Sequence, residues 1–227
     1  MAFTFSPRLI KFLRALERNN EREWFADNKA RYEAEVREPA LDFIEAMAEP
    51  LQKVSTHFVA MPKKTGGSLM RPYRDTRFSK DKTPYKTNVG IQFRHELARD
   101  VHSPGYYFHI APREVFIGVG MWRPEPKALA AIRERIVSHP DEWKKVGRSR
   151  NFAKHFELAG ESLVRQPRGF DAENPLISDI KRKDFIGVKT LEADDLYTDS
   201  LIKDTTAVFK AASPLMQFLC KAVGISY

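Results

Sequence analysis

Hydrophobic residues recur along the chain at two different spacings, which separate helical from extended stretches. In Pro7–Arg18, apolar residues fall three or four positions apart, the spacing of one face of an α-helix. Ser6 followed by Pro7 is typical of a helix start, because serine caps a helix and proline fits its first turn. A second helical pattern covers Trp24–Val54, with Pro39 as a kink or as the start of another helix. The sequence therefore predicts an N-terminal pair of helices.

The middle of the chain changes to the alternating pattern of β-strands. Residues Thr87–His95 alternate apolar and polar side chains, and Gly105–Ala111 and Glu114–Met121 follow as two strands with a two-residue connection. Turn residues between Phe58–Met61 and Ser68–Tyr73 indicate two further short strands. Consecutive strands joined by short turns favour a mostly antiparallel sheet with one covered face.

Helical spacing returns in the last hundred residues. The predicted helices are Pro126–Val137, Asp141–Val146, Arg150–Leu158, Pro175–Lys181 and Asp195–Val223, the last being one helix or two divided at Pro214, and Asp184–Thr190 is predicted as a strand. This order predicts an α+β fold and a single domain over residues 1–227. In that fold the N-terminal helix pair and the C-terminal helices pack on a mostly antiparallel sheet.

The composition limits the environment and the partners that we expect for the protein. The apolar runs are far shorter than the ~20 residues of a membrane-spanning helix, so we expect no membrane partner. One cysteine, Cys220, cannot form an intramolecular disulfide, which fits a reducing compartment. The net charge of +8 and the pI near 9.5 favour contact with anions.

Half of that net charge lies in one segment, Arg71–Lys86, where six cations accompany two aspartates. Arginine forks and lysine ammonium groups suit phosphate and carboxylate oxygens, so we expect the segment to be a loop that binds an anionic small molecule. The candidate ligands of the anion are Arg71, Arg74, Arg77, Lys80, Lys82 and Lys86. Asp75 and Asp81 are candidates for orienting these cations or for holding a metal ion. The alternative is that the aspartates pair internally with the cations and simply hold the loop.

Aromatic and polar side chains supply the candidate walls of such a pocket. Trp24, Asn28 and Tyr32 recur every four residues and share one helix face, although a helical aromatic stripe more often packs in a core. Tyr107 and His109 share one face of a strand, where a lone histidine is more often structural than catalytic. The full set of wall candidates is Trp24, Asn28, Tyr32, Tyr85, Asn88, Tyr107, His109 and Trp122.

Several well-defined chemical motifs are missing from the sequence. It has no Gly-x4-Gly-Lys-Ser/Thr phosphate loop, no dinucleotide-binding glycine fingerprint, no His-Glu-x-x-His motif and no cysteine pair for zinc. No nucleophile and base can be paired from spacing alone. We therefore predict no cofactor and no metal site, and we assign no catalytic residue, which leaves open whether the protein is an enzyme.

Two other functions fit the same charge. A second basic patch supports a nucleic-acid-binding module and consists of Lys144, Lys145, Arg148, Arg150 and Lys154. An interaction protein whose basic loop docks an acidic partner is the third hypothesis. The sequence indicates no oligomeric state.

The motifs also resemble a known family. The chain is similar to DUF2461, an uncharacterised family of bacterial and fungal proteins, over nearly its whole length. The resemblance rests on Trp24-Phe25-x-x-Asn28-Lys29-x-x-Tyr32, on Arg74-Asp75-x-Arg77-Phe78-x-Lys80-Asp81-Lys82-x-Pro84-Tyr85-Lys86-Thr87-Asn88, and on the later Tyr107-x-His109, Gly118-x-Gly120-x-Trp122-x-Pro124 and Pro167-x-Gly169-Phe170. It implies a single intact domain and a cytoplasmic protein, and it implies no reaction.

Overall fold

A six-stranded antiparallel sheet lies at the centre of the protein, of which the computed structural model describes residues 3–98 and 102–227. The strand order is β1-β2-β3-β4-β6-β5, and all neighbours run antiparallel. The strands are β1 (Phe58–Val59), β2 (Val89–His95), β3 (Gly105–Ile110), β4 (Val115–Met121), β5 (Glu157–Ala159) and β6 (Phe185–Leu191). The predicted α+β fold with an antiparallel sheet is confirmed.

The two faces of the sheet differ because side chains alternate along each strand. On β2, Val89, Ile91 and Phe93 are buried in the hydrophobic core. Between them, Gly90 lies opposite His109 of β3, and cross-strand partners share one face of a sheet. One face of the sheet is therefore a core surface, and the other carries glycine and polar or aromatic residues.

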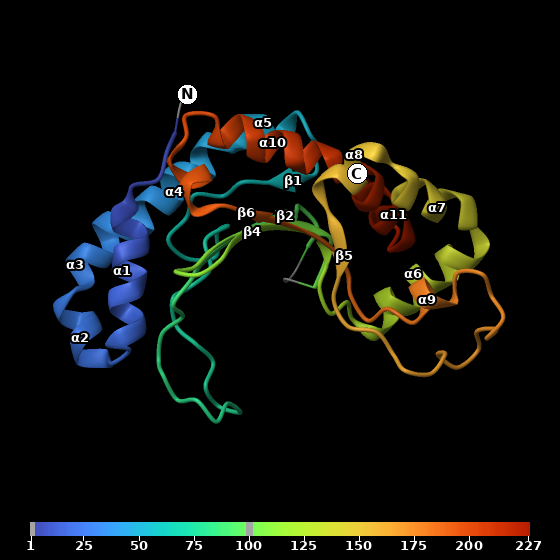
Figure 1. The fold of residues 1–227 in the computed structure, drawn as a ribbon, viewed down its shortest axis with the longest axis horizontal. Coiled ribbons are helices and arrows are strands. Elements are labelled where there is room, and N and C mark those ends of the chain that lie inside the picture. Colours follow the sequence, from blue (N-terminus) through green and yellow to red (C-terminus); the bar gives the residue numbers. More distant parts are fainter. Residues whose placement is uncertain (1–2, 99–101) are drawn as a thin grey trace.

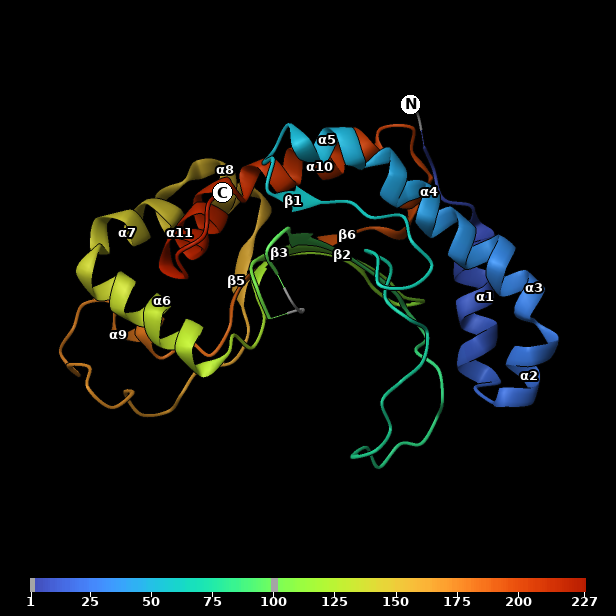
Figure 2. The ribbon, with the colours of Figure 1, turned by 180° about the vertical axis from the view of Figure 1, so that it is seen from behind.

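Helices cover the core face. Phe43 of α4 packs 4.9 Å from Phe108, and Phe209 of α10 stacks 4.5 Å from Tyr106 (distances between ring centroids). Figures 1 and 2 show α5 and α10 above the sheet, which arches between α1–α3 (residues 7–32) at one end and α6 and α9 at the other. These helices are α4 (Glu38–Ala46), α5 (Ala48–Gln52), α6 (Pro126–Ser138), α7 (Pro140–Arg148), α8 (Arg150–His155), α9 (Ile177–Ile180), α10 (Leu201–Ala211) and α11 (Ser213–Ala222). Within the described ranges, none is long and apolar enough to cross a membrane.

The N-terminal helix pair forms as the sequence predicts at its start, but its second member is divided into several shorter helices. Helix α1 covers Pro7–Arg18, and the Ser6 hydroxyl accepts a hydrogen bond from Arg8 N in the first turn. The predicted long second helix is divided into α2 (Arg22–Asp27), α3 (Lys29–Tyr32), a π-helical turn (Glu33–Arg37), α4 and α5. The π turn directly precedes α4, whose first turn contains Pro39, a residue with no backbone N–H to donate.

Three of the predicted helices and strands differ from the structure in their bounds or in their type. Helix α8 ends at His155, and the residues predicted as its last turn form β5 instead, pairing with β6 at the sheet edge. The predicted strand Ser68–Tyr73 is reduced to two isolated bridges, one from Leu69 to Ile91 of β2 and one from Tyr73 to Tyr85. The predicted C-terminal helix is two helices, α10 and α11, with Pro214 in the first turn of α11.

Candidate functional site

The basic segment Arg71–Lys86 forms a long loop that extends from the sheet beside its concave side (Figure 1). Backbone hydrogen bonds close the base of the loop, because the Arg74 N–H donates to Pro84 O and the Lys86 N–H donates to Pro72 O. The loop is therefore a narrow two-stranded ribbon at its base and irregular at its tip.

Asn20, in the turn between α1 and α2, fixes the base of the loop to the helix pair. Its Nδ2 donates to Tyr85 O at 2.9 Å, and its Oδ1 accepts from Tyr85 N at 3.0 Å. The Tyr85 ring is buried and stacks on Phe25 of α2, with ring centroids 4.0 Å apart. One asparagine thus satisfies both backbone groups of a residue 65 positions away, which joins two segments that the sequence separates widely.

The two aspartates of the loop each pair with an arginine. The Asp75 carboxylate accepts from Arg77 Nη2 at 2.7 Å, and this side-chain bond is the main reason that the pKa of Asp75 falls to about 2. The pKa of Asp81 also falls to about 2, first because its carboxylate accepts from Thr83 N and then because it accepts from Arg74 Nη1 at 2.5 Å. The internal pairing considered for this loop is therefore present for these two arginines.

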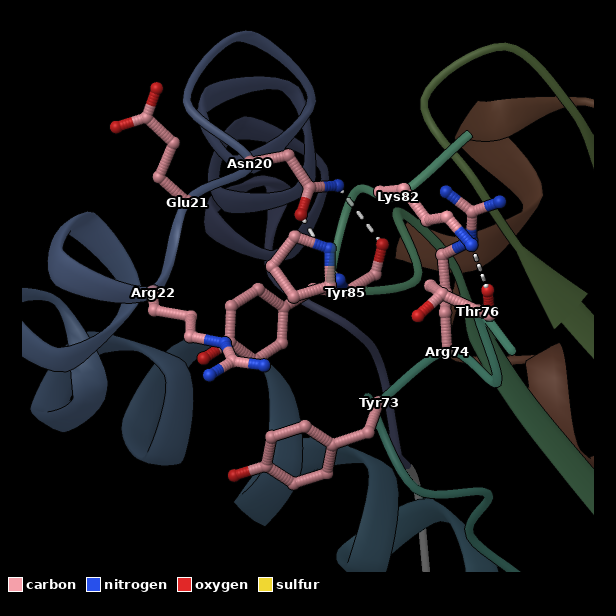
Figure 3. A pocket seen from close by; sticks show the side chains of 9 residues that line it. Asn20, Glu21, Arg22, Tyr73, Arg74, Thr76, Lys82 and Tyr85 are labelled. Atoms are coloured by element: carbon pink, nitrogen blue, oxygen red, sulfur yellow. Dashed lines mark hydrogen bonds between the residues drawn. The ribbon is translucent and has the colours of Figure 1, made fainter. Parts of the chain in front are cut away.

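A pocket of about 580 Å³ opens between the base of the loop and the α1–α2 turn (Figure 3). We call it the basic pocket. Its lining residues are Asn20, Glu21, Arg22, Tyr73, Arg74, Thr76, Lys82, Pro84 and Tyr85. Figure 3 shows the Arg22 guanidinium turned toward the Tyr85 ring and the Glu21 carboxylate turned away from the pocket.

Three cations from two distant segments reach the basic pocket: Arg22, Arg74 and Lys82. Arg74 uses only its Nη1 for bonds to Asp81 and Thr83, so no described residue accepts from its Nε or Nη2. The Lys82 ammonium donates to Thr76 O at 2.9 Å, which positions the charge without neutralising it. The pocket therefore keeps an excess of positive charge.

The other predicted cations lie outside this pocket. Arg77 is exposed beside Phe78, and Arg71 and Lys80 are exposed as well. Lys86 is half-buried, and burial, followed by the nearby charge of Arg71, lowers the pKa of its ammonium group. Within the described residues, no ion pair joins Arg71, Lys80 or Lys86 to a carboxylate. The structure thus brings together two of the six predicted cations, Arg74 and Lys82, and adds Arg22.

Three of the predicted wall residues pack within the N-terminal helices. The Trp24 and Tyr32 rings lie 5.8 and 5.9 Å from the Phe12 ring of α1, and Tyr32 is buried. The Asn28 Nδ2 donates to Trp24 O at 2.9 Å, and its Oδ1 accepts from Arg31. These residues line neither the basic pocket nor the cavity described next, and the same holds for Asn88, which is half-buried just before β2.

The remaining wall candidates, Tyr107, His109 and Trp122, line a second cavity of about 600 Å³ on the concave face of the sheet. We call it the sheet cavity. Its lining also includes Met70, Gln92, Gly105, Glu114, Val115, Phe116, Gly118, Val119, Gly120, Ile186, Val188 and Thr190. The predicted single pocket is thus represented by two cavities, and Tyr85 belongs to the basic pocket while Tyr107 belongs to the sheet cavity.

Polar groups in the sheet cavity form a short chain. The Tyr107 hydroxyl lies 2.9 Å from His109 Nδ1, and His109 Nε2 lies 3.5 Å from the Glu114 carboxylate. Burial raises the pKa of Tyr107 to about 12 and lowers the pKa of His109, against a smaller raising effect of Glu114. Burial therefore favours the neutral form of both side chains. The prediction that Tyr107 and His109 share one strand face is confirmed by this contact.

One group of potential metal ligands exists among the described residues: His57, His95 and Glu96. The Nε2 of His95 bonds to Ser226 O and its Nδ1 accepts from Leu97 N, so both ring nitrogens are already used. The rings of His57 and His95 stack at 16°, so their in-plane lone pairs do not converge on one point. The donor set does not fit a metal ion.

The second basic patch lies on α7 and α8, away from the basic loop (Figure 1). Acidic residues of α7 accompany it: Lys144 lies 3.7 Å from Asp141, and Glu142 pairs with Arg135 and Lys221. The patch and the basic loop therefore do not form one continuous positive face.

Sequence reasoning missed Asn20 and Arg22 at the basic pocket and Glu114 at the sheet cavity. Asn20 and Arg22 flank the turn between two predicted helices, and no local pattern indicates that this turn meets a loop 65 residues later. The sequence indicated only weakly that Glu114 lies near His109, because Glu114 begins a predicted strand whose partner strand carries His109.

Comparison with known proteins identifies a family. The model of a family described as "Conserved hypothetical protein (DUF2461)" matches residues 8–218, nearly the whole chain. No curated protein and no solved structure matches the chain.

Proposed function

The chain belongs to the DUF2461 family, and we propose that it binds a small phosphate- or carboxylate-bearing molecule in the basic pocket. The observation that carries this proposal is that Arg22, at the start of α2, lines the same pocket as Arg74 and Lys82 of the loop. Cations brought together from distant segments repel one another, and a bound anion removes that repulsion. Phosphate and carboxylate oxygens match the arginine forks in geometry as well as in charge.

The aspartates have an orienting role in this proposal. Asp81 bonds to one terminal nitrogen of Arg74 and fixes the direction of the guanidinium, while the remaining donors stay available for a ligand. Tyr73, which is half exposed, and Tyr85 lie with ring centroids 5.5 Å apart at the side of the pocket. These rings suit a flat organic part of the ligand.

Reversing one charge in the basic pocket should weaken phosphate binding strongly. We expect Lys82→Glu to lower the affinity for inorganic phosphate at least roughly tenfold at low ionic strength, because a cation facing the anion becomes a repelling carboxylate. Isothermal titration calorimetry measures the change. Lys127→Glu is the matched control, since Lys127 is exposed on α6 and lines no described pocket. Equal weakening by both substitutions, or no phosphate binding by the unaltered protein, would contradict the proposal.

Nucleic-acid binding is the second candidate, and it rests on the net charge and on the patch over α7 and α8. Its signature is a steep fall in affinity with salt, because phosphate contacts release counterions. Loss of oligonucleotide binding in Lys145→Glu, with unchanged phosphate binding, would favour that patch over the basic pocket. Docking of an acidic protein partner is the third candidate, and it requires that Lys80→Glu and Lys82→Glu reduce partner recovery.

A further inference from the structure

The sheet cavity has walls of a different character from the basic pocket, and the two share no lining residue. Phe116 of β4 and Ile186 and Val188 of β6 form an apolar floor, with Met70 at one side. Trp122, half exposed, stands at the end of β4. A concave site with mainly apolar walls and a few polar groups is typical of small-molecule binding.

Glycines keep this cavity open. Gly118 lies directly opposite Tyr107, where a β-carbon would meet the tyrosine ring and Cβ at ordinary contact distances of 3.7 Å. A side chain would therefore fit at Gly118 and would occupy the cavity. At Gly90 a β-carbon would lie 2.7 Å from the Tyr107 hydroxyl and 3.0 Å from Met70 Sδ. Because Gly90 has no side chain, the Tyr107 hydroxyl can occupy this space.

The polar chain in the cavity determines which hydrogen bond a ligand can make. His109 Nε2 is buried, has no hydrogen-bond partner among the described residues, and lies 3.5 Å from the Glu114 carboxylate, whose negative charge favours the proton on Nε2 and the lone pair on Nδ1. The Tyr107 O–H consequently donates to Nδ1 at 2.9 Å. The tyrosine oxygen then offers only its lone pairs to the cavity, which suits a ligand with an O–H or N–H donor.

Charge in the cavity excludes anions. No lysine or arginine among the described residues lines it, and its one charged lining residue is the acidic Glu114. An organic cation has little access to the Trp122 ring, because the Arg123 guanidinium lies 4.8 Å from the ring centroid and His102 stacks on the ring. A neutral molecule is neither repelled by the Glu114 carboxylate nor dependent on a cation contact with the Trp122 ring.

From these observations we infer that the sheet cavity is a second binding site, for a compact, uncharged, mainly aromatic or aliphatic molecule that carries one hydroxyl or N–H donor. Its body lies over Phe116, Gly118 and Val188, and its donor bonds to the Tyr107 oxygen. This inference does not depend on anion binding in the basic pocket, because the two sites use different residues and opposite chemistry.

The test uses 2-naphthol as a neutral probe, titrated into the full chain by calorimetry and by amide chemical shifts. We expect saturable binding with shifts centred on the amides of Tyr107 and Gly118. Gly118→Val should weaken this binding at least tenfold by filling the cavity, and the β-branched residue suits a strand. Gly147→Ala is the control, because Gly147 is exposed on α7 with open space around it. The affinity of this variant for 2-naphthol should stay within twofold of that of the unaltered protein.

A second variant and a second probe keep the result interpretable if Gly118→Val folds poorly. Tyr107→Phe keeps the ring and removes the oxygen, so it should weaken 2-naphthol binding about threefold to tenfold. The anion 2-naphthoate has a carboxylate in place of the hydroxyl and should bind the sheet cavity at least tenfold more weakly than 2-naphthol. The inference is overturned if shifts from 2-naphthol lie elsewhere, if both glycine variants bind alike, or if 2-naphthoate binds this cavity as tightly as 2-naphthol.

Discussion

Replacing Gly120 with alanine should destabilise the protein by at least about 3 kcal/mol, measured by urea unfolding. Gly120 has a φ of +113°, a conformation that side-chain-bearing residues rarely adopt. An added β-carbon would lie 2.1 Å from Phe185 O of the paired strand β6, a carbonyl that cannot move without disturbing the β4–β6 pairing. The substitution therefore adds strain and a backbone clash at the same place.

Gly118→Ala is the matched control for this expectation. Gly118 lies in the same strand and has ordinary space around its β-carbon position. Alanine there should change the free energy of unfolding by less than about 1 kcal/mol and favour the folded state, because glycine weakens a strand. Similar losses in both variants would show that the conformation of Gly120 has no special role in the pairing of β4 with β6.

Replacing Asn20 with alanine should release the base of the basic loop. The substitution removes both side-chain bonds to the Tyr85 backbone, in a partly buried position, and should cost about 1–3 kcal/mol of stability. Hydrogen exchange of the Tyr85 and Arg74 amides should become faster, and phosphate affinity should fall because Arg74 and Lys82 lose their fixed position relative to Arg22. Exchange measured by NMR and phosphate titration together check this expectation.

The neighbouring asparagine provides the control. Asn19 is exposed, and among the described residues its side chain donates only to Ala15 O within α1. Asn19→Ala should leave loop exchange and phosphate affinity unchanged. Faster exchange in the loop of Asn19→Ala, or unchanged exchange in Asn20→Ala, would show that the turn does not anchor the loop.

The sequence correctly predicted the helices and strands that are determined by neighbouring residues in the chain. Helix α1 begins and ends as its cap and apolar spacing indicate, and the β3–β4 hairpin follows from alternating side chains around a short turn. Strand β5 was missed because its three residues gain their extended form from pairing with β6 at the sheet edge. Pairing of that kind depends on residues far away in the chain.

The site residues show the same division. Helical spacing correctly places Trp24, Asn28 and Tyr32 on neighbouring turns, but it cannot show that α1 covers the two rings through Phe12. Alternation places Tyr107 and His109 on one strand face, and their 2.9 Å contact agrees. Arg22 could not be assigned to the same pocket as Arg74, because their common lining depends on how the helix pair packs against the loop.

A crystal structure of the protein soaked in phosphate tests the central claim most directly. The account predicts an anion in the basic pocket, bonded to Arg22 and to Arg74 or Lys82, with Asp81 still paired to Arg74. A phosphate bound only over α7 and α8, or a basic pocket left without an anion at concentrations that saturate binding in solution, would contradict it.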